Sequence, residues 1–445
     1  QINTGKDDPA GLIASQSLLA EQKGTEAAIA NAQRADNIMS TADGALSEVG
    51  NLLVSLQGLV NSTANSAGLS QDEKDANQLQ VDSILTTINR ISSSASFEGT
   101  KLLNGNFSYT TSGLATTSAF TSVSINSAKV GSSPLAVTVK VITSAQTGHL
   151  NFQGTTSSLT GAATITVAGN KGSVQLAFAS STRSSSVVAT INQFTDTTGV
   201  SAKMSADNKT ILLASSGFGA TQYVSVTSNT SNFSTKDSNG VATTSNYGSN
   251  ATLTVNGVSA TSDGLNVKAV SDNMDTSFTL NAAFNTKGLS KTFGITGGGA
   301  TFSLGSQVNA SNLASIGIST VDNAHLGRTL YTDKTGSSSI LSLSDLGSGK
   351  AAALNSGDTV AAQNIVNQAV KDVAALRGRL GAFQKNVIGS TINSLNVADE
   401  NIASANSAIR DTDFATETAN MTRSQILASS ATTVLQQANS VRNRC

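Results

Sequence analysis

The chain has little of what stabilises small disulfide-rich domains or marks membrane-spanning segments. Its 445 residues include one cysteine, two prolines and no tryptophan, and only 12% are charged. Because the single cysteine, Cys445, is the last residue, no internal disulfide forms. No apolar run approaches the roughly 20 residues that a membrane span needs, and no signal peptide opens the sequence. A net charge of -1 gives no surplus that would attract nucleic acid or an anionic membrane.

What the chain does have is a regular apolar spacing near its amino end. Between Ala35 and Val60, apolar residues recur every seven positions in three rows, a stripe wider than that of a dimeric coiled coil. We therefore expect a helix from Pro9 to about Ala64 that contacts more than one neighbour. Asp7 and Asp8 favour its start. The rows are Ala35, Ala42, Val49 and Leu56, then Ile38, Ala45, Leu52 and Leu59, then Met39, Leu46, Leu53 and Val60.

A second helix and a second arm are expected from the same kind of pattern. A small, polar break at Asn61–Gly68 precedes a helix that starts near Leu69, which predicts an antiparallel helix pair. Near the carboxyl end, apolar residues from Ala362 to Val387 alternate steps of four and three, which indicates a heptad repeat. Two successive steps of four after Val387 indicate a stutter that unwinds the supercoil locally. A break at 411–413 precedes a further helix.

Between about Ser108 and Ser356, alternation of apolar and polar residues replaces the heptads. Such alternation is typical of strands, and the sequences Gly169–Gly172 and Asn256-Gly257 are typical of hairpin turns. The high content of Ser and Thr could also indicate a disordered stalk, but regular aliphatic alternation argues against it. The clearest expected strands are Leu135–Ile142, Ala163–Val167, Ser173–Phe178 and Ala251–Val255.

Motifs at both chain ends resemble the bacterial flagellin family. The resemblance is specific, because several motifs fall in the right order, and it covers roughly residues 1–105 and 355–440. In the middle, residues 186–194, 199–203 and 211–215 resemble the flagellin IN motif, which implies one helix packed on a small sheet. Residues 295–302 are similar to a return strand of longer family members. The motifs at the ends are Gln1–Gly11, Leu376–Gln384, Ile409–Thr418 and Ser424–Leu427.

Together these patterns predict an α+β protein, with long coiled-coil-like helical rods from both chain ends packed together and β-rich domains inserted between them. We expect the rods at 1–107 and 355–440 and the insert at 108–354, with the IN-like motif at about 161–229. Residues 441–445 form an atypical tail.

The resemblance implies a structural subunit of the flagellar filament that assembles through its helical arms. It implies a secreted, extracellular location in the flagellum or at the cell surface. The implied partners are other flagellin subunits, an export chaperone and the filament cap, with a surface glycan as a further candidate. Two alternatives stay open: a cell-surface adhesin or polysaccharide-binding protein on the same scaffold, and a hook-filament junction protein.

The sequence opens at Gln1 and closes on Val441–Cys445, without the extreme terminal helices and the apolar ending of the family. We therefore expect a terminally truncated chain that is monomeric by itself and does not polymerise. In such a chain the segment Asp413–Ser440 should be loosely held, because its partner at the amino end is missing.

The residues expected to pack and assemble the arms come from both ends. We expect Leu52, Leu56 and Leu59 to be buried against the second helix and the carboxyl-terminal rod. The full set of expected packing and assembly residues is Ile38, Leu46, Val49, Leu52, Leu53, Leu56, Leu59, Val373, Leu376, Leu380, Phe383, Ile402 and Ile409.

No residue pattern favours an enzyme, a cofactor or a metal. The two histidines, His149 and His325, are far apart in the sequence, and no zinc spacing is present. Gly347–Lys350 ends like a phosphate-binding loop, but Ser344 replaces its first glycine and Ala351 its final Ser or Thr. Gly297–Gly299 is better explained as a bulge or a tight turn. We therefore expect no catalytic residue and no cofactor.

Overall fold

The structure is a computed structural model. It describes residues 8–64, 68–114, 119–131, 133–154, 157–206, 208–332, 338–355, 358–411 and 414–442. The chain divides into two compact units, which are described separately. The smaller unit contains residues 1–40, 302–314 and 380–445, and the larger contains 41–301 and 315–379. Asp7, Asp413 and Cys445, which the sequence analysis singled out, lie outside the described residues.

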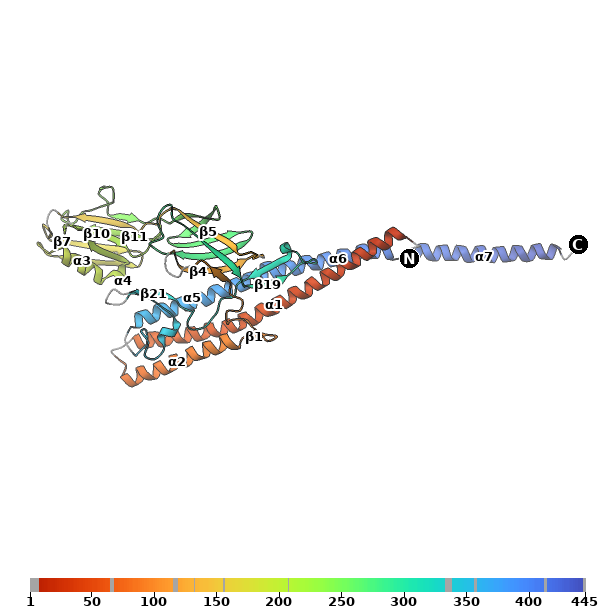
Figure 1. Ribbon diagram of the computed structural model, residues 1–445, viewed down its shortest axis with the longest axis horizontal. Helices are drawn as coiled ribbons and strands as arrows, with labels where there is room; N and C mark the ends of the chain where they lie inside the picture. The colour runs from red at the N-terminus through yellow and green to blue at the C-terminus, as the bar shows by residue number, and fades with distance from the viewer. Residues whose placement is uncertain are drawn as a thin grey trace. The chain divides into compact units, whose positions relative to one another are not determined.

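Long helices form both ends of the chain, as the periodicity predicted (Figure 1, red to orange and blue). At the amino end, α1 runs from Pro9 to Ala64 and α2 from Gln71 to Ser94. At the carboxyl end, the helices are α5 (Thr359–Phe383), α6 (Ser390–Arg410) and α7 (Phe414–Arg442). The predicted bounds of α1 are confirmed, and α6 ends just before Asp411, where the break was predicted; the rest of that break, residues 412–413, lies outside the described residues.

Polar side chains fix where the first two helices begin. Asp8 Oδ1 accepts hydrogen bonds from the backbone N–H groups of Ala10 and Gly11, each at 3.0 Å. At α2, the Ser70 hydroxyl accepts from the Glu73 backbone N–H (3.3 Å), and the Glu73 carboxylate accepts from the Ser70 backbone N–H (2.8 Å). This capping box satisfies two N–H groups that the helix itself leaves unpaired. The bond from the Ser70 backbone also lowers the pKa of Glu73.

The interruption predicted after Val387 lies at a change of helix type. Residues Gln384–Gly389 form a π-helical segment, η3, between α5 and α6. A π-helical turn has i→i+5 hydrogen bonds and takes in one more residue than an α-helical turn, so it unwinds the helix locally. The two four-residue steps from Val387 to Leu395 therefore marked the right region. The structure shows a π-helical segment at this place, and the predicted unwinding of the supercoil itself stays a prediction.

An eight-stranded antiparallel sheet forms one part of the β-rich middle (Figure 1). Its core holds Val137, Val139 and Val141, which are the alternate residues of the predicted strand at 135–142. Asn256 and Gly257 both have positive φ (50° and 83°), which is the requirement of a two-residue hairpin turn. In sheet order the strands are β3 (Thr110–Ser112), β18 (Ser290–Gly297), β5 (Leu135–Thr143), β14 (Thr252–Val255), β15 (Val258–Asp263), β16 (Asn266–Ser271), β17 (Met274–Leu280) and β4 (Phe120–Ala128).

The IN-like segment lies in a second β-rich part, where two four-stranded sheets enclose one core. The predicted helix is α3 (Ser184–Gln193), whose Val187 and Ile191 are buried among sheet residues such as Ile211 and Leu213. A short helix, α4 (Thr195–Thr198), follows it. One sheet has the order β12 (Thr235–Lys236), β6 (His149–Gln153), β10 (Thr210–Ser215), β9 (Val200–Met204), and the other β13 (Ser245–Tyr247), β11 (Tyr223–Ser228), β7 (Ala163–Gly169), β8 (Gly172–Phe178).

Short elements complete the chain between the sheets and the helices. Gly298 and Gly299, with φ of 90° and 80°, turn the chain after β18, so the predicted turn at 297–299 is confirmed. The short elements are β1 (Ser96–Phe97), β2 (Thr100–Lys101), β19 (Ala300–Ser303), η1 (Ala310–Asn312), β20 (Leu313–Ile316), β21 (Thr329–Thr332), β22 (Ser338–Leu341) and η2 (Leu343–Leu346).

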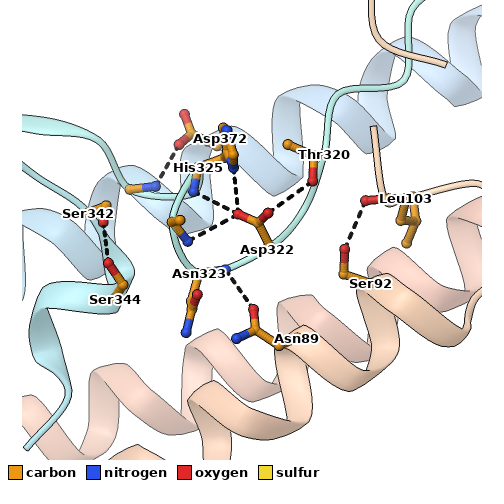
Figure 2. A network of polar contacts seen from close by, with 12 residues as sticks. Asn89, Ser92, Leu103, Thr320, Asp322, Asn323, His325, Ser342, Ser344 and Asp372 are labelled. Carbon is orange, nitrogen blue, oxygen red and sulfur yellow. Dashed lines mark hydrogen bonds and ion pairs between the residues drawn. The ribbon is translucent and has the colours of Figure 1, made fainter. Parts of the chain in front are cut away.

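The loop at residues 320–328 forms hydrogen bonds with the helices of the larger unit. Figure 2 shows the Asp322 carboxylate bonded to the His325 ring nitrogen Nδ1 at 2.7 Å. The Asn323 backbone N–H donates to Asn89 Oδ1 on α2, and the Gly327 backbone N–H donates to Asp372 Oδ2 on α5, both at 3.0 Å. This part of the expected insert therefore contacts two helices.

Candidate assembly surface

In the larger unit, α1 and α5 lie antiparallel. Gln57 Nε2 donates to Asn367 Oδ1 at 2.9 Å, and Arg377 Nε donates to Asp43 Oδ1 at 2.8 Å. Residue numbers therefore fall along α5 as they rise along α1. The hydrogen bond that Arg377 donates to Asp43 raises the pKa of the Arg377 guanidinium. Segments more than 300 positions apart in the sequence thus form one helical pair.

Heptad residues of both helices supply the buried apolar side chains of this pair. Two of the three predicted rows on α1 are enclosed, and so is the predicted row on α5. A helix face that is buried in this way does not remain free to bind another protein. The buried side chains are Ala42, Leu46, Val49, Leu53, Leu56 and Val60 on α1, and Ala362, Val366, Ala369, Val373 and Leu376 on α5.

Helix α2 adds apolar side chains and a buried amide. Val81, Leu85 and Ile88 are buried along one face of α2. Gln78 is also buried: its Nε2 donates to the Leu346 carbonyl at 2.8 Å, and its Oε1 accepts from the Leu354 backbone N–H at 2.7 Å. One side chain thereby satisfies two backbone groups of the segment that leads into α5.

In the smaller unit, the first part of α1 pairs with η3 and α6 through polar contacts. Ser15 Oγ donates to Asn406 Oδ1 at 2.7 Å, and Gln384 Nε2 donates to Asp36 Oδ1 at 3.2 Å. Small residues and Met39 fill most of the interior on the α1 side. On the opposite side Leu380 and Ile388 are buried, but no residue of α6 is. This pair therefore buries far less apolar surface than the pair in the larger unit.

The structure divides the predicted assembly residues into two groups. One group is buried within the chain: Leu46, Val49, Leu53, Leu56, Val373, Leu376 and Leu380. The other is only half-buried: Ile38, Leu52, Leu59, Phe383, Ile402 and Ile409. The prediction that Leu52, Leu56 and Leu59 are all buried was right only for Leu56. The row at Ile38, Ala45, Leu52 and Leu59 lies at the edge of the stripe, where part of each side chain stays exposed.

Helix α7 presents its apolar side chains to solvent. Phe414 is 80% exposed, and none of the other large apolar residues of this helix is less than 55% exposed. These residues are Met421, Ile426, Leu427, Val434 and Leu435. No membrane-spanning helix is present in the described residues, because none of their helices combines sufficient length with sufficient hydropathy. Exposed apolar side chains in such number mark a surface that binds protein.

The residues weighed for catalysis have structural roles. In the part of the chain that the structure describes, no group of three or more acidic, histidine or cysteine side chains gathers as metal ligands would. His325 pairs with Asp322 in the loop at 320–328. In the loop that resembles a phosphate-binding motif, the Ser348 backbone N–H donates to Asp82 Oδ1 on α2 at 3.0 Å. That loop thus binds a carboxylate of its own chain.

One polar cluster was not anticipated from the sequence. Arg379 on α5 donates from Nη1 to Asn126 Oδ1 on β4, and Asn126 Nδ2 donates to Asp275 Oδ1 on β17 at 3.0 Å. The enclosed Arg379 Nε has no hydrogen-bond partner. Burial lowers the pKa of the Arg379 guanidinium, and Asp275 opposes this effect. The apolar repeat of α5 is unbroken at this point, so no pattern in the sequence pointed to Arg379.

Two antiparallel helical arms from opposite chain ends, a β-rich insert and an exposed apolar helix define a structural protein that assembles with other subunits. Residues 1–108 match the bacterial flagellin N-terminal helical region, and residues 363–444 match the flagellin C-terminal helical region. The second match extends into the tail that was expected to be atypical.

Two of the relatives named here match along nearly the whole chain, and the third matches over about a quarter of it. "Flagellin B" of Vibrio anguillarum is 27% identical over 98% of this chain and 87% of its own length. "Flagellin" of Salmonella rubislaw is 29% identical over 99% of this chain and 91% of its own. "Polar flagellin F" of Vibrio parahaemolyticus is 41% identical over 24% of this chain and 28% of its own.

The chain belongs to the bacterial flagellin family and is a structural subunit of the flagellar filament. It is not an enzyme, and as a filament subunit it associates with other components of the flagellum.

Proposed function

We propose that the filament contacts of this subunit come from α7 and from the half-buried rows of the arms, while the fully buried rows hold each subunit together. The exposed apolar side chains of α7 carry this proposal. A helix with no buried face gains most of its stability from packing against a partner. Binding to neighbouring subunits would cover Ile426, Leu427 and Val434 at once.

Single charged substitutions on α7 test this proposal. Leu427→Asp should abolish filaments in bacteria whose only flagellin is this protein, because a buried unpaired carboxylate is costly. Gln436→Asp is the matched control. At 100° per residue it lies opposite Leu427 on α7, and it should leave filament length unchanged by electron microscopy. Normal filaments with Leu427→Asp would contradict the role of this face.

We also infer that the free chain is monomeric in dilute solution. The argument is that the richest apolar rows, on α1 and α5, are already covered within the chain, which leaves only edge contacts and α7 for neighbours. In sedimentation velocity we expect a single species, with fast hydrogen exchange across Met421–Leu435. Strong protection of this segment in a dilute sample would overturn the inference.

The remaining partners are proposed from the family resemblance. The chain is secreted through the flagellar export route with a dedicated chaperone, and it is added beneath a filament cap. A composition with one cysteine and two prolines suits a chain that travels unfolded, because no disulfide and few slow prolyl isomerisations delay its folding. Co-purification of the chaperone with the unassembled protein would test this route. A surface glycan is a further partner proposed for the insert.

A further inference from the structure

A long groove lies in the larger unit between α5 and the outward face of β4, β16 and β17. Its volume is about 880 Å³. The residues of α5 that line it run from Gln368 to Arg379, which corresponds to about 16 Å of helix. Such a length suits an extended, chain-like ligand better than a single small ion.

Hydroxyl and amide groups form the floor of the groove. Ser122 Oγ donates to Thr279 Oγ1 at 3.1 Å, and Thr279 Oγ1 donates to Asn266 Oδ1 at 2.8 Å, so one polar row crosses three strands. A second row pairs Lys268 with Ser277 across β16 and β17. The hydroxyl and amide groups of these rows both donate and accept hydrogen bonds, and Lys268 donates, as recognition of a polyhydroxylated molecule requires.

Positive charge dominates the lining of the groove. Lys268, Arg328 and Arg379 line it, and Asp372 is the acidic residue that does so. The Asp372 carboxylate already accepts hydrogen bonds from the Gly327 backbone N–H (3.0 Å) and from Gln368 Nε2 (2.8 Å). Among the described residues, Lys268 and Arg328 form no ion pair, and Arg379 Nε is enclosed without a hydrogen-bond partner. The groove therefore has cationic groups that its own carboxylates do not neutralise.

The part of the chain that surrounds the groove also has an excess of positive charge. Residues 108–354 contain 13 Lys and Arg, nine Asp and no Glu, a net charge of +4 in a chain whose total is -1. Asp275, whose charge opposes the lowering of the Arg379 pKa, accepts a hydrogen bond from Asn126 Nδ2 at 3.0 Å. Asp322 pairs with His325 at the loop end of the groove. The lining itself carries the cations Lys268, Arg328 and Arg379 against one carboxylate, that of Asp372, so it attracts an anionic ligand.

We propose that this groove binds an acidic oligosaccharide, with Lys268 and Arg328 contacting its carboxylates and the Ser122–Thr279–Asn266 row contacting its hydroxyl groups. This inference narrows the surface glycan proposed above to one chemical class and one site. It does not depend on filament assembly through α7, so Leu427→Asp should leave binding unchanged. Failure of either proposal can therefore be told apart from failure of the other.

Calorimetric titration of the full chain with a uronate tetrasaccharide tests the proposal. We expect saturable binding that weakens as salt is added, and little binding of maltotetraose, a neutral chain of the same length. Lys268→Gln should weaken binding roughly tenfold, the usual effect of losing one charge-assisted hydrogen bond. Lys140→Gln is the matched control. It removes an exposed lysine from β5 of the same sheet, outside the groove, and should change nothing.

Four outcomes would overturn the proposal. These are equal binding of maltotetraose, equal effects of the Lys268 and Lys140 substitutions, equal affinity for inorganic sulfate, and equal affinity for a hexaglutamate peptide. The last two would show a site for any anion or polyanion. Hydrogen exchange gives an independent readout: the tetrasaccharide should protect residues 266–279 and leave 210–215 unchanged. Protection confined to another part of the chain would place the ligand elsewhere.

Discussion

Helices α5 and α7 both carry apolar residues, but these residues differ completely in burial. On α5, Val366, Ala369 and Val373 are at most 2% exposed, whereas on α7 Ile426 and Val434 are at least 60% exposed. The apolar spacing therefore indicates that a helix needs a partner, but not whether the partner lies in the same chain. For α5 the partner is α1 of its own chain, and for α7 we propose that it is a neighbouring subunit.

The largest difference between the two regions is expected when one leucine in each is replaced by alanine and the free energy of unfolding is measured. Leu56→Ala on α1 should lower the free energy of unfolding by about 2–5 kcal/mol, because its side chain is fully buried and leaves a cavity. Leu427→Ala on α7 should change it by less than about 0.5 kcal/mol. Denaturant unfolding of the dilute protein measures both. Equal losses would mean that α7 is packed within the free chain.

A buried amide gives the next largest effect. Gln78→Ala should leave the Leu346 carbonyl and the Leu354 backbone N–H without partners, at about 1–3 kcal/mol for each group. Gln436→Ala, on exposed α7, is the control and should be neutral within about 0.5 kcal/mol. If both variants unfold at the same denaturant concentration as the parent protein, the contacts of Gln78 contribute nothing.

The ion pair between α1 and α5 should contribute less. Arg377 and Asp43 are each more than one third exposed, so a double-mutant cycle with Arg377→Gln and Asp43→Asn should give a coupling energy of about 0.2–1 kcal/mol. The coupling should shrink in high salt, because exposed charges are screened. A coupling that does not respond to salt would indicate that the pair acts through packing.

The smallest effect concerns pH and the start of α2. The pKa of Glu73 is lowered in the folded protein, so its stabilising contribution is present above the unfolded pKa and is lost as the pH falls through the folded value. Below about pH 4.5 we expect faster hydrogen exchange in the first turn of α2. Glu73→Gln should remove this pH dependence. An unchanged pH response in that variant would assign the effect to another carboxylate.

Local sequence patterns predicted individual helices and turns well, because capping and turn formation depend on residues that are neighbours in the sequence. Asp8 and Pro9 begin α1 where capping requires it, and the hairpin at Asn256-Gly257 follows from the positive φ that these residues tolerate. The irregularity after Val387 was also visible, but its type was not. A π-helical turn and a supercoil stutter both interrupt the heptad repeat, and the π-helical turn is recognised only by its i→i+5 backbone hydrogen bonds.

The amino-acid sequence by itself determined the helical arms, the strands of the insert and the membership of the flagellin family, because periodicity and motifs depend on neighbouring residues. Only the tertiary structure decided which heptad rows are enclosed, since that depends on contacts between α1 and α5 across more than 300 positions. It also placed Arg379 beside Asn126 and Asp275 and brought Lys268 to the same groove. Strand order and helix packing create such neighbours, and no local repeat specifies them.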